Sequence, residues 1–293
     1  MTVTTEEGGP EGEGGSSQAP RISIKLPRAG LRQLGARYAL LLAILVIFGL
    51  FSFLEPVIFP TWANVRTIIS SQSVLLVLAL SLLFPMRAGD FDLSMAANMS
   101  FSAAIAGAAV TNWGFSTWEA AVLALGCGLG FGTFHALLIV WAKLDAFIVT
   151  LGSLFLMTGL TFWVSGGRVF LVQNGQAFQT MSRHRFLGLQ MSIYYAIALA
   201  FIIWYIFQFT RFGRYLLVVG DGRESARLMG IHVPRIRAAA FMLTGLIASF
   251  SGLLLVGKLR AVDPSIGLHL LLPPYAGVFI GATVIQLGRF NVW

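Results

Sequence analysis

Cysteine is almost absent from this sequence. Cys127 is the only cysteine among 293 residues, and it lies within an apolar stretch. A single thiol excludes a disulfide framework and a cysteine-based metal site within one chain. The histidines are too widely spaced to indicate a metal cluster; they are His135, His184, His232 and His269. We therefore expect neither a bound metal nor a cofactor.

Motifs of hydrolytic enzymes are missing as well, because the sequence contains no HExxH and no GxSxG. The run from Gly252 to Lys258 does fit the GxxxxGK pattern of a phosphate-binding loop. That loop needs a Ser or Thr for Mg²⁺ at the next position, where this chain has Leu259 inside an apolar stretch. The chain is therefore predicted to hold no ATP site and to be no enzyme. Its energy source would be another subunit or an ion gradient.

Charged residues are scarce, at 11% of the chain, whereas hydrophobic residues make up 57% and the mean hydropathy is +0.80. This composition excludes an ordinary soluble domain. A membrane-spanning helix needs about 20 apolar residues, so uncharged stretches predict an all-α, polytopic transmembrane bundle of about eight segments. Leu93–Trp118 carries enough polar residues to be broken or re-entrant. The eight stretches are Tyr38–Leu54, Thr67–Met86, Leu93–Trp118, Ala120–Ala142, Ala146–Gly167, Phe186–Thr210, Ala238–Gly257 and Pro264–Gly288.

Acidic residues are fewer than basic ones, with 12 Asp and Glu against 20 Lys and Arg. The basic residues lie in the gaps between apolar stretches, so we expect contact with membrane lipids and no nucleic acid. If the N-terminus is inside, fourteen of the twenty fall in inside gaps, which the positive-inside rule favours. The loop 168–190 would then be outside, where it either contacts an external partner or is simply solvated. The six outside are Arg66, Arg168, Arg183, Arg185, Lys258 and Arg260.

The N-terminal region has no signal-peptide pattern, since residues 1–20 are rich in Gly and Glu and lack a basic start. We expect residues 1–37 to be a disordered cytoplasmic tail that ends in a basic run against anionic headgroups. Residues 38–293 would form the membrane domain.

A polar group opens the third apolar stretch: Asp90, Asp92, Ser94 and Asn98. One interpretation is a helix N-cap, with Asp92 or Ser94 accepting from free backbone N–H groups. The other is a polar segment that borders a translocation path, since carboxylates at a membrane segment are costly unless they face water or a partner. The two interpretations do not exclude each other.

The longest inside gap, residues 211–237, carries six Arg with Asp221 and Glu224. Gly220–Asp221–Gly222 is typical of a turn. The residues from Glu224 to Met229 then predict a short helix with Gly230 at its C-terminal end. A short helix in a cytoplasmic loop is a candidate docking element for a cytoplasmic protein.

Three motifs in this order resemble those of ATP-binding-cassette sugar permeases, the ribose/xylose branch of the branched-chain/ribose permease superfamily. The first is the run Ala88–Ser94, which resembles that family's GG-I-D-L-S motif. The second comprises Gly213-Arg214-Tyr215, Val219-Gly220 and the run Ala226–Ile231. The third comprises Leu272–Ala276, Gly281-Ala282-Thr283 and Gly288–Trp293. The resemblance covers roughly residues 38–293, and in the family further helices follow the last motif, so we expect the chain to be incomplete at its C-terminus.

The resemblance implies a bacterial inner-membrane permease, homodimeric, with two ATPase subunits inside and a periplasmic or lipid-anchored sugar-binding protein outside. It would import a monosaccharide by alternating access, driven by the separate ATPase. Asp90, Asp92, Ser94 and Asn98 are the candidate substrate path. The coupling segment is predicted to use Gly213, Arg214, Gly220, Glu224, Ala226, Arg227 and Gly230.

Two other classes stay open. An ion-coupled secondary transporter of a small polar solute would need ionisable residues in mid-membrane. Here Asp90 and Asp92 lie at a segment edge, and Glu119 and Asp145 lie in short gaps. A membrane-embedded enzyme is disfavoured because no catalytic constellation is visible.

Overall fold

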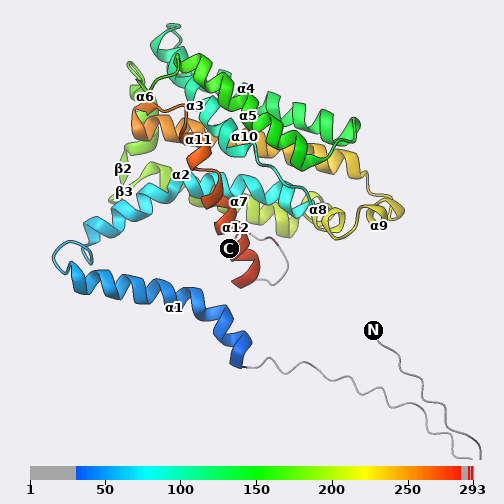
Figure 1. The fold of residues 1–293 in the computed structure, drawn as a ribbon, viewed down its shortest axis with the longest axis horizontal. Coiled ribbons are helices and arrows are strands. Elements are labelled where there is room, and N and C mark those ends of the chain that lie inside the picture. The colour runs from blue at the N-terminus through cyan, green and yellow to red at the C-terminus, as the bar shows by residue number, and fades with distance from the viewer. Residues whose placement is uncertain (1–30, 285–289, 291, 293) are drawn as a thin grey trace, which may run out of the picture.

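The structure is a computed structural model that describes residues 31–284, 290 and 292. Within this part the chain is almost entirely helical (Figure 1), which confirms the predicted all-α class. Most of the tail predicted over residues 1–37 lies outside the described residues. Residues 31–37, which the sequence assigned to that tail, belong to helix α1 instead.

The helices follow one another with short connections. Four strands of two residues each form two small antiparallel pairs, β1 with β4 and β2 with β3. A π-helix, η1, continues α4. The helices are α1 Leu31–Leu54, α2 Trp62–Arg87, α3 Met95–Thr111, α4 Thr117–Ala136, η1 Leu137–Trp141, α5 Ala146–Ser165, α6 Gln176–Arg183, α7 Met191–Phe209, α8 Arg211–Asp221, α9 Arg223–Leu228, α10 Val233–Leu259, α11 Ile266–His269 and α12 Leu272–Val284. The strands are β1 Phe170–Leu171, β2 Arg185–Phe186, β3 Leu189–Gln190 and β4 Ala261–Val262.

Five of these helical segments are long and apolar enough to cross a membrane: α2, α4 with η1, α5, α7 and α10. The shortest, α7, has 19 residues, or about 28 Å at 1.5 Å per residue, close to the apolar thickness of a bilayer. The chain is therefore a multi-pass membrane bundle. The other three predicted stretches contain shorter apolar helices, including α3 with 17 residues. The count of eight segments stays a prediction.

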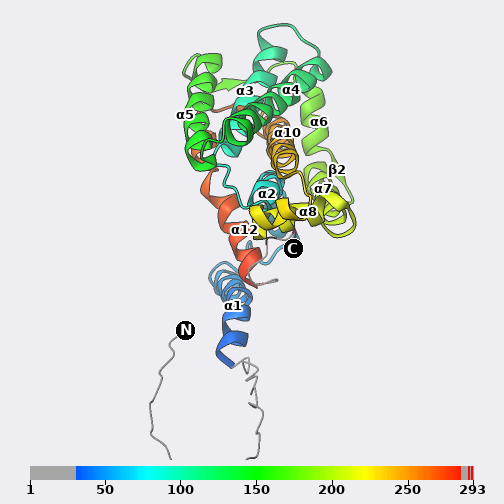
Figure 2. The same ribbon diagram turned by 90° about the vertical axis from the view of Figure 1, so that its right-hand side faces the viewer.

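Helix α10 is the centre of the bundle. In Figure 2 it lies among α2, α3, α4 and α6. Of its most apolar 18 consecutive residues, 72% are buried. Side chains on α10 donate to backbone carbonyls of α2: Thr244 Oγ1 to Ser81 O at 3.0 Å and Ser251 Oγ to Val74 O at 3.0 Å. The pairing shows that α2 and α10 are antiparallel. Hydrogen bonds of this kind hold helices together in lipid, where apolar burial alone gives little preference for one neighbour.

Glycines let α10 approach its neighbours backbone to backbone. A Cβ on Gly245 would collide with the carbonyl of Gly128 in α4, and a Cβ on Gly252 with the carbonyl of Met99 in α3. Among the glycines of α4, Gly128 faces α10, whereas Gly126 has open space around it. The GxxxxGK run therefore lies inside a packed helix, and its first glycine serves close packing.

The antiparallel helices give the bundle two distinct ends (Figure 1). One end holds the turn between α2 and α3, helices α8 and α9, and the start of α10. The opposite end holds α6, the β2–β3 hairpin and the end of α10. The two ends carry different sets of charged residues.

Candidate coupling site

The corner between α7 and α8 begins the predicted coupling segment. Thr210 caps α8, because its Oγ1 accepts from Gly213 N at 3.2 Å. Gly213 is buried in the corner, where a Cβ would collide with the backbone of Ile206 and Phe207. Arg214 follows on the exposed side of α8. The Gly-Arg pair of the motif thus combines a close backbone crossing with an exposed cation.

Gly220, near the end of α8, rests on the turn that follows α2. A Cβ on Gly220 would collide with the carbonyl oxygen of Arg87. Gly89 lies on the other side of this contact and has a φ of +76°. A Cβ on Gly89 would lie 3.5 Å from Gly220 Cα. Two of the motifs that the sequence showed far apart therefore meet here: Gly220 leaves no room for a side chain against Arg87, and Gly89 supplies the positive φ of the turn.

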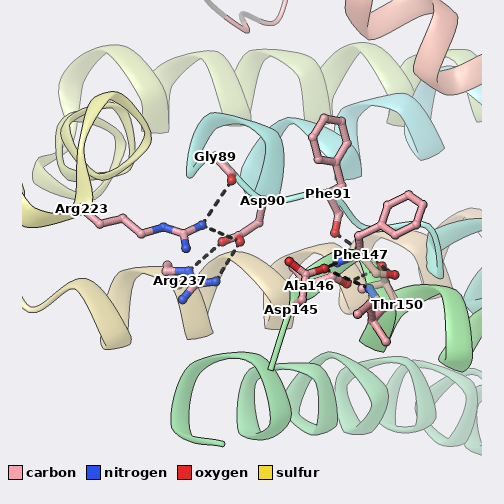
Figure 3. Close-up of polar contacts among 10 residues, drawn as sticks. Gly89, Asp90, Phe91, Asp145, Ala146, Phe147, Thr150, Arg223 and Arg237 are labelled. Carbon is pink, nitrogen blue, oxygen red and sulfur yellow. Dashed lines mark hydrogen bonds and ion pairs between the residues drawn. The ribbon is translucent and has the colours of Figure 1, made fainter. Parts of the chain in front are cut away.

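Asp90 ties the same turn to two arginines (Figure 3). Arg237, in α10, donates Nε to Asp90 Oδ2 at 2.7 Å and Nη2 to Oδ1 at 2.8 Å. Arg223, at the start of α9, donates Nη2 to Asp90 Oδ1 at 2.7 Å and to Gly89 O at 3.2 Å. The side chain of Asp90 is 3% exposed, that of Arg237 12% and that of Arg223 46%. One buried carboxylate therefore joins α2, α9 and α10.

The two ion pairs differ in strength. The Asp90–Arg237 pair is bidentate and nearly buried, a geometry that charge-assisted hydrogen bonds favour. Removing one member of such a buried pair typically destabilises a protein by about 3–5 kcal/mol, because a charge is left without its partner. Arg223 is half exposed, so its pair with Asp90 contributes less. Arg237 thus anchors Asp90 to the bundle, and Arg223 links that anchor to α9.

Helix α9 is the short helix that the sequence predicted, here over Arg223–Leu228. Ala226 is buried against Val219 and Val233, which fixes one face of the helix. Gly230 ends it with φ +78°, and the amide of Ile231 returns to the Ala226 carbonyl at 3.0 Å. This is the left-handed helix end at which glycine is preferred.

The opposite face of α9 is exposed. Glu224 and Arg227 form an ion pair at 3.2 Å, with 75% and 67% of their side chains exposed, so the pair contributes little to stability. Beside them Leu228 is 83% exposed and Met229 63%. Large apolar side chains next to charges at a helix end are typical of a contact surface. Sequence reasoning missed Leu228 and Met229, because an apolar residue at a helical position is more often buried.

A polar cavity of about 530 Å³ lies between the α2–α3 turn, the α4–α5 loop and the start of α10. Asp145 lies in its wall and caps α5, accepting from Phe147 N at 2.9 Å and Ile148 N at 3.2 Å (Figure 3). Four cations share the wall with Asp90 and Asp145. They are Lys143, Arg223, Arg227 and Arg237. The cavity is therefore open and charged.

The residues predicted to cap the third segment do so only in part. Asp92 Oδ1 accepts from Ser94 N at 2.9 Å and from Ser94 Oγ at 2.6 Å, so its carboxylate closes a turn one residue before α3 begins. Ser94 occupies the N-cap position but makes no side-chain cap hydrogen bond. Of the two alternatives, Asp92 or Ser94, it is thus Asp92 that accepts from a free backbone N–H at this helix start.

Asn98 lies deeper, where α3, α4 and α10 meet. Its Nδ2 donates to Gly245 O at 3.2 Å, and Ser102 Oγ donates to its Oδ1 at 3.3 Å. Asp92, Ser94 and Asn98 are all at most 2% exposed, and their polar groups bond to the protein. Of the four predicted path residues, the structure thus groups Asp90 with the coupling segment and places the others in the packed interior. Their role along a path stays a prediction.

Comparison with known proteins agrees with these motifs. The family described as "Branched-chain amino acid transport system / permease component" matches residues 64–290. This range includes the α2–α3 turn, α8, α9 and α10. The chain belongs to this permease family. The resemblance drawn from the three motifs is therefore confirmed.

The chain is also similar to several named permeases. The ribose import permease protein of Escherichia coli K12 is 27% identical over 255 residues, covering 86% of this chain and 79% of the relative. The L-arabinose permease protein of Azospirillum brasilense is 29% identical, covering 87% of this chain and 76% of the relative. A probable permease of Sinorhizobium fredii is 30% identical and covers 78% and 68%. No solved structure matches the chain.

Proposed function

We propose that this permease is the membrane subunit of an ATP-binding-cassette importer that carries a monosaccharide across a bacterial inner membrane. The observation that carries the proposal is the match to ribose and arabinose permeases over most of the chain. Their shared range is long enough to include both the Asp90 turn and α9. We expect the N-terminus and residues 211–237 to be cytoplasmic.

The partners follow from the same proposal. An ATPase subunit would contact the exposed face of α9 and the cavity beside it. A sugar-binding protein would deliver the sugar at the opposite end, and a second copy of the permease would complete the path. Closure of the ATPase pair would push on α9, and Asp90 would pass that motion to α10, the helix that contacts most of the bundle. No step requires a covalent intermediate on this chain.

The alternative of an ion-coupled transporter is not favoured by the carboxylates. Each Asp or Glu among the described residues lies in a loop or near a helix end, as with Glu119, which forms a capping box with Ser116 at the start of α4. In a proton- or sodium-coupled carrier we would expect such a group in mid-membrane.

Reconstitution tests the proposal directly. The permease would be placed in proteoliposomes with the ATPase and binding-protein products of adjacent genes, and uptake of labelled ribose and arabinose would be measured. We expect uptake that needs internal ATP and the binding protein. Uptake driven by a proton or sodium gradient without ATP would support the carrier class instead.

The orientation gives a separate prediction. In a Cys127→Ser background, a cysteine is placed at Ser225, on exposed α9, or at Phe186, exposed on the β2–β3 hairpin. An impermeant maleimide should label the Phe186→Cys variant in intact cells and the Ser225→Cys variant only after permeabilisation, because the more basic side of the bundle, which includes residues 211–237, stays inside. Labelling of Ser225→Cys in intact cells would show that the orientation is the opposite of the one proposed.

A further inference from the structure

A second charged cavity lies at the opposite end of the bundle from Asp90. It encloses about 360 Å³ between the start of α2, the end of α10 and the β2–β3 hairpin. Four cations line it, and no Asp or Glu belongs to the described residues of its wall. The rest of the wall combines apolar residues with Thr67, Ser70, Ser71, Gly188 and Gln190. The cations are Arg66, Arg183, Arg185 and Lys258, and the apolar residues are Val74, Leu75, Leu255, Leu259 and Leu270.

Among the described residues these four cations have no carboxylate partner; Arg66 and Lys258 are half-buried, whereas Arg183 and Arg185 are exposed. Over residues 31–284 none of them is in an ion pair. Lys258 Nζ donates only to neutral oxygens, the Ser70 carbonyl and Ser73 Oγ, the latter at 3.0 Å. Arg66 Nε is buried and makes no hydrogen bond to any described residue, and the same holds for Gln190 Oε1 in the same wall. The cavity therefore combines unpaired positive charge with unused polar atoms.

Such an arrangement favours an anion. Positive charges that share a partly buried cavity repel one another, and a bound anion removes both that repulsion and part of their desolvation cost. Arginine presents a fork of N–H donors that matches phosphate or carboxylate oxygens. A carboxylate carries one negative charge, whereas a phosphate monoester carries between one and two. Phosphate thus matches a group of four cations better.

The depth of the wall adds a second constraint. Arg66 lies near the start of α2, and Leu75 lies nine residues further along it, about 13 Å deeper at 1.5 Å per residue. On α2, Val74 and Leu75 therefore lie deeper than Arg66. On α10, Leu255 lies about one turn deeper than Lys258. We propose that this cavity binds the phosphate group of an organic phosphate, with the carbon body against the apolar wall. The phosphate would come from a phosphorylated sugar in solution or from the phosphomonoester headgroup of a lipid such as phosphatidic acid.

The proposal concerns the folded chain and does not rest on the proposed sugar import. Its test uses the purified full-length protein in detergent. Inorganic phosphate, a hexose phosphate and short-chain phosphatidic acid are titrated, with the free hexose and short-chain phosphatidylcholine as uncharged and zwitterionic controls. Fluorescence gives the readout, since Trp62 lies 5.9 Å from the Arg66 guanidinium carbon. A Trp62→Phe variant identifies its share of the signal.

Two variants and a matched control separate the cavity from general charge. Arg66→Gln and Arg185→Gln each remove one cation from the wall. Arg168→Gln makes the same change at an exposed position of the α5–β1 loop that does not belong to the described cavity wall. We expect phosphate compounds to bind and each wall variant to weaken binding about tenfold or more, as for a lost charge-assisted hydrogen bond. Arg168→Gln should bind as the wild type does.

The pattern of ligands assigns the source. Binding of phosphatidic acid without the hexose phosphate assigns the site to a lipid, and the reverse assigns it to a soluble sugar phosphate. Binding of both supports recognition of the phosphate itself. The proposal is overturned if no phosphate compound binds more tightly to the wild type than to Arg66→Gln, or if Arg168→Gln loses as much. It is also overturned if none of the phosphate compounds binds and the cavity is instead the binding site of an acidic protein.

Discussion

Replacing Asp90 with Asn should abolish coupled uptake while leaving the permease in the membrane. The substitution keeps the shape of the side chain and removes its charge. Arg237, only 12% exposed, then has no carboxylate, and the cost of about 3–5 kcal/mol for breaking a buried pair falls on the joint between α2, α9 and α10. We expect a loss of ATP-dependent uptake of more than tenfold, with a lower melting temperature in detergent.

Asp145→Asn is the matched control for this prediction. It makes the same chemical change in the wall of the same cavity. Asp145 caps α5, and Asn is nearly as good as Asp at that position, so uptake should be retained. The double variant Asp90→Asn with Arg237→Gln removes the buried unpaired cation and leaves only the half-exposed Arg223 without a carboxylate, so it should recover stability but not coupling. Normal uptake by Asp90→Asn would show that the contact of Asp90 with α9 and α10 is not needed for coupling.

The second large effect is expected at the exposed face of α9. If this face contacts the ATPase, Glu224→Arg and Leu228→Ser should each reduce recovery of the ATPase in a pull-down by about tenfold, the size of a hot-spot residue. Neither side chain is buried in the permease itself, so the folded bundle should be unaffected. Pull-down at matched expression, followed by measurement of stimulated ATPase activity, gives the result.

Two controls test whether the face is merely solvated. Leu187→Ser removes an equally exposed leucine, 82% against 83%, from the hairpin at the opposite end, and it should leave recovery unchanged. Glu224→Arg combined with Arg227→Glu restores the local ion pair with reversed charges. If the pair matters only to itself, the double variant should behave as the wild type. Full recovery with Glu224→Arg alone would remove the docking hypothesis.

The sequence by itself determined the local features of this permease. Long uncharged stretches predicted membrane helices, since the bilayer demands about 20 apolar residues for each crossing. The run from Glu224 to Met229 predicted a short helix, and α9 ends at Gly230 because glycine permits the positive φ of a helix end. The order of three motifs was enough to indicate the family. Each of these signals is contained in a few neighbouring residues.

Only the tertiary structure decided which distant residues act together. Asp90 and Arg237 are 147 positions apart, and they meet because α2 and α10 pack antiparallel with the end of one beside the start of the other. The requirement for glycine at position 220 became visible only in the structure, where a Cβ would collide with the Arg87 carbonyl. Asn98 links α3 to α10 through its hydrogen bond to the Gly245 carbonyl, a contact that the sequence did not indicate. A side chain's partner depends on how whole helices pack, and many packings of the same apolar helices satisfy one hydrophobic pattern.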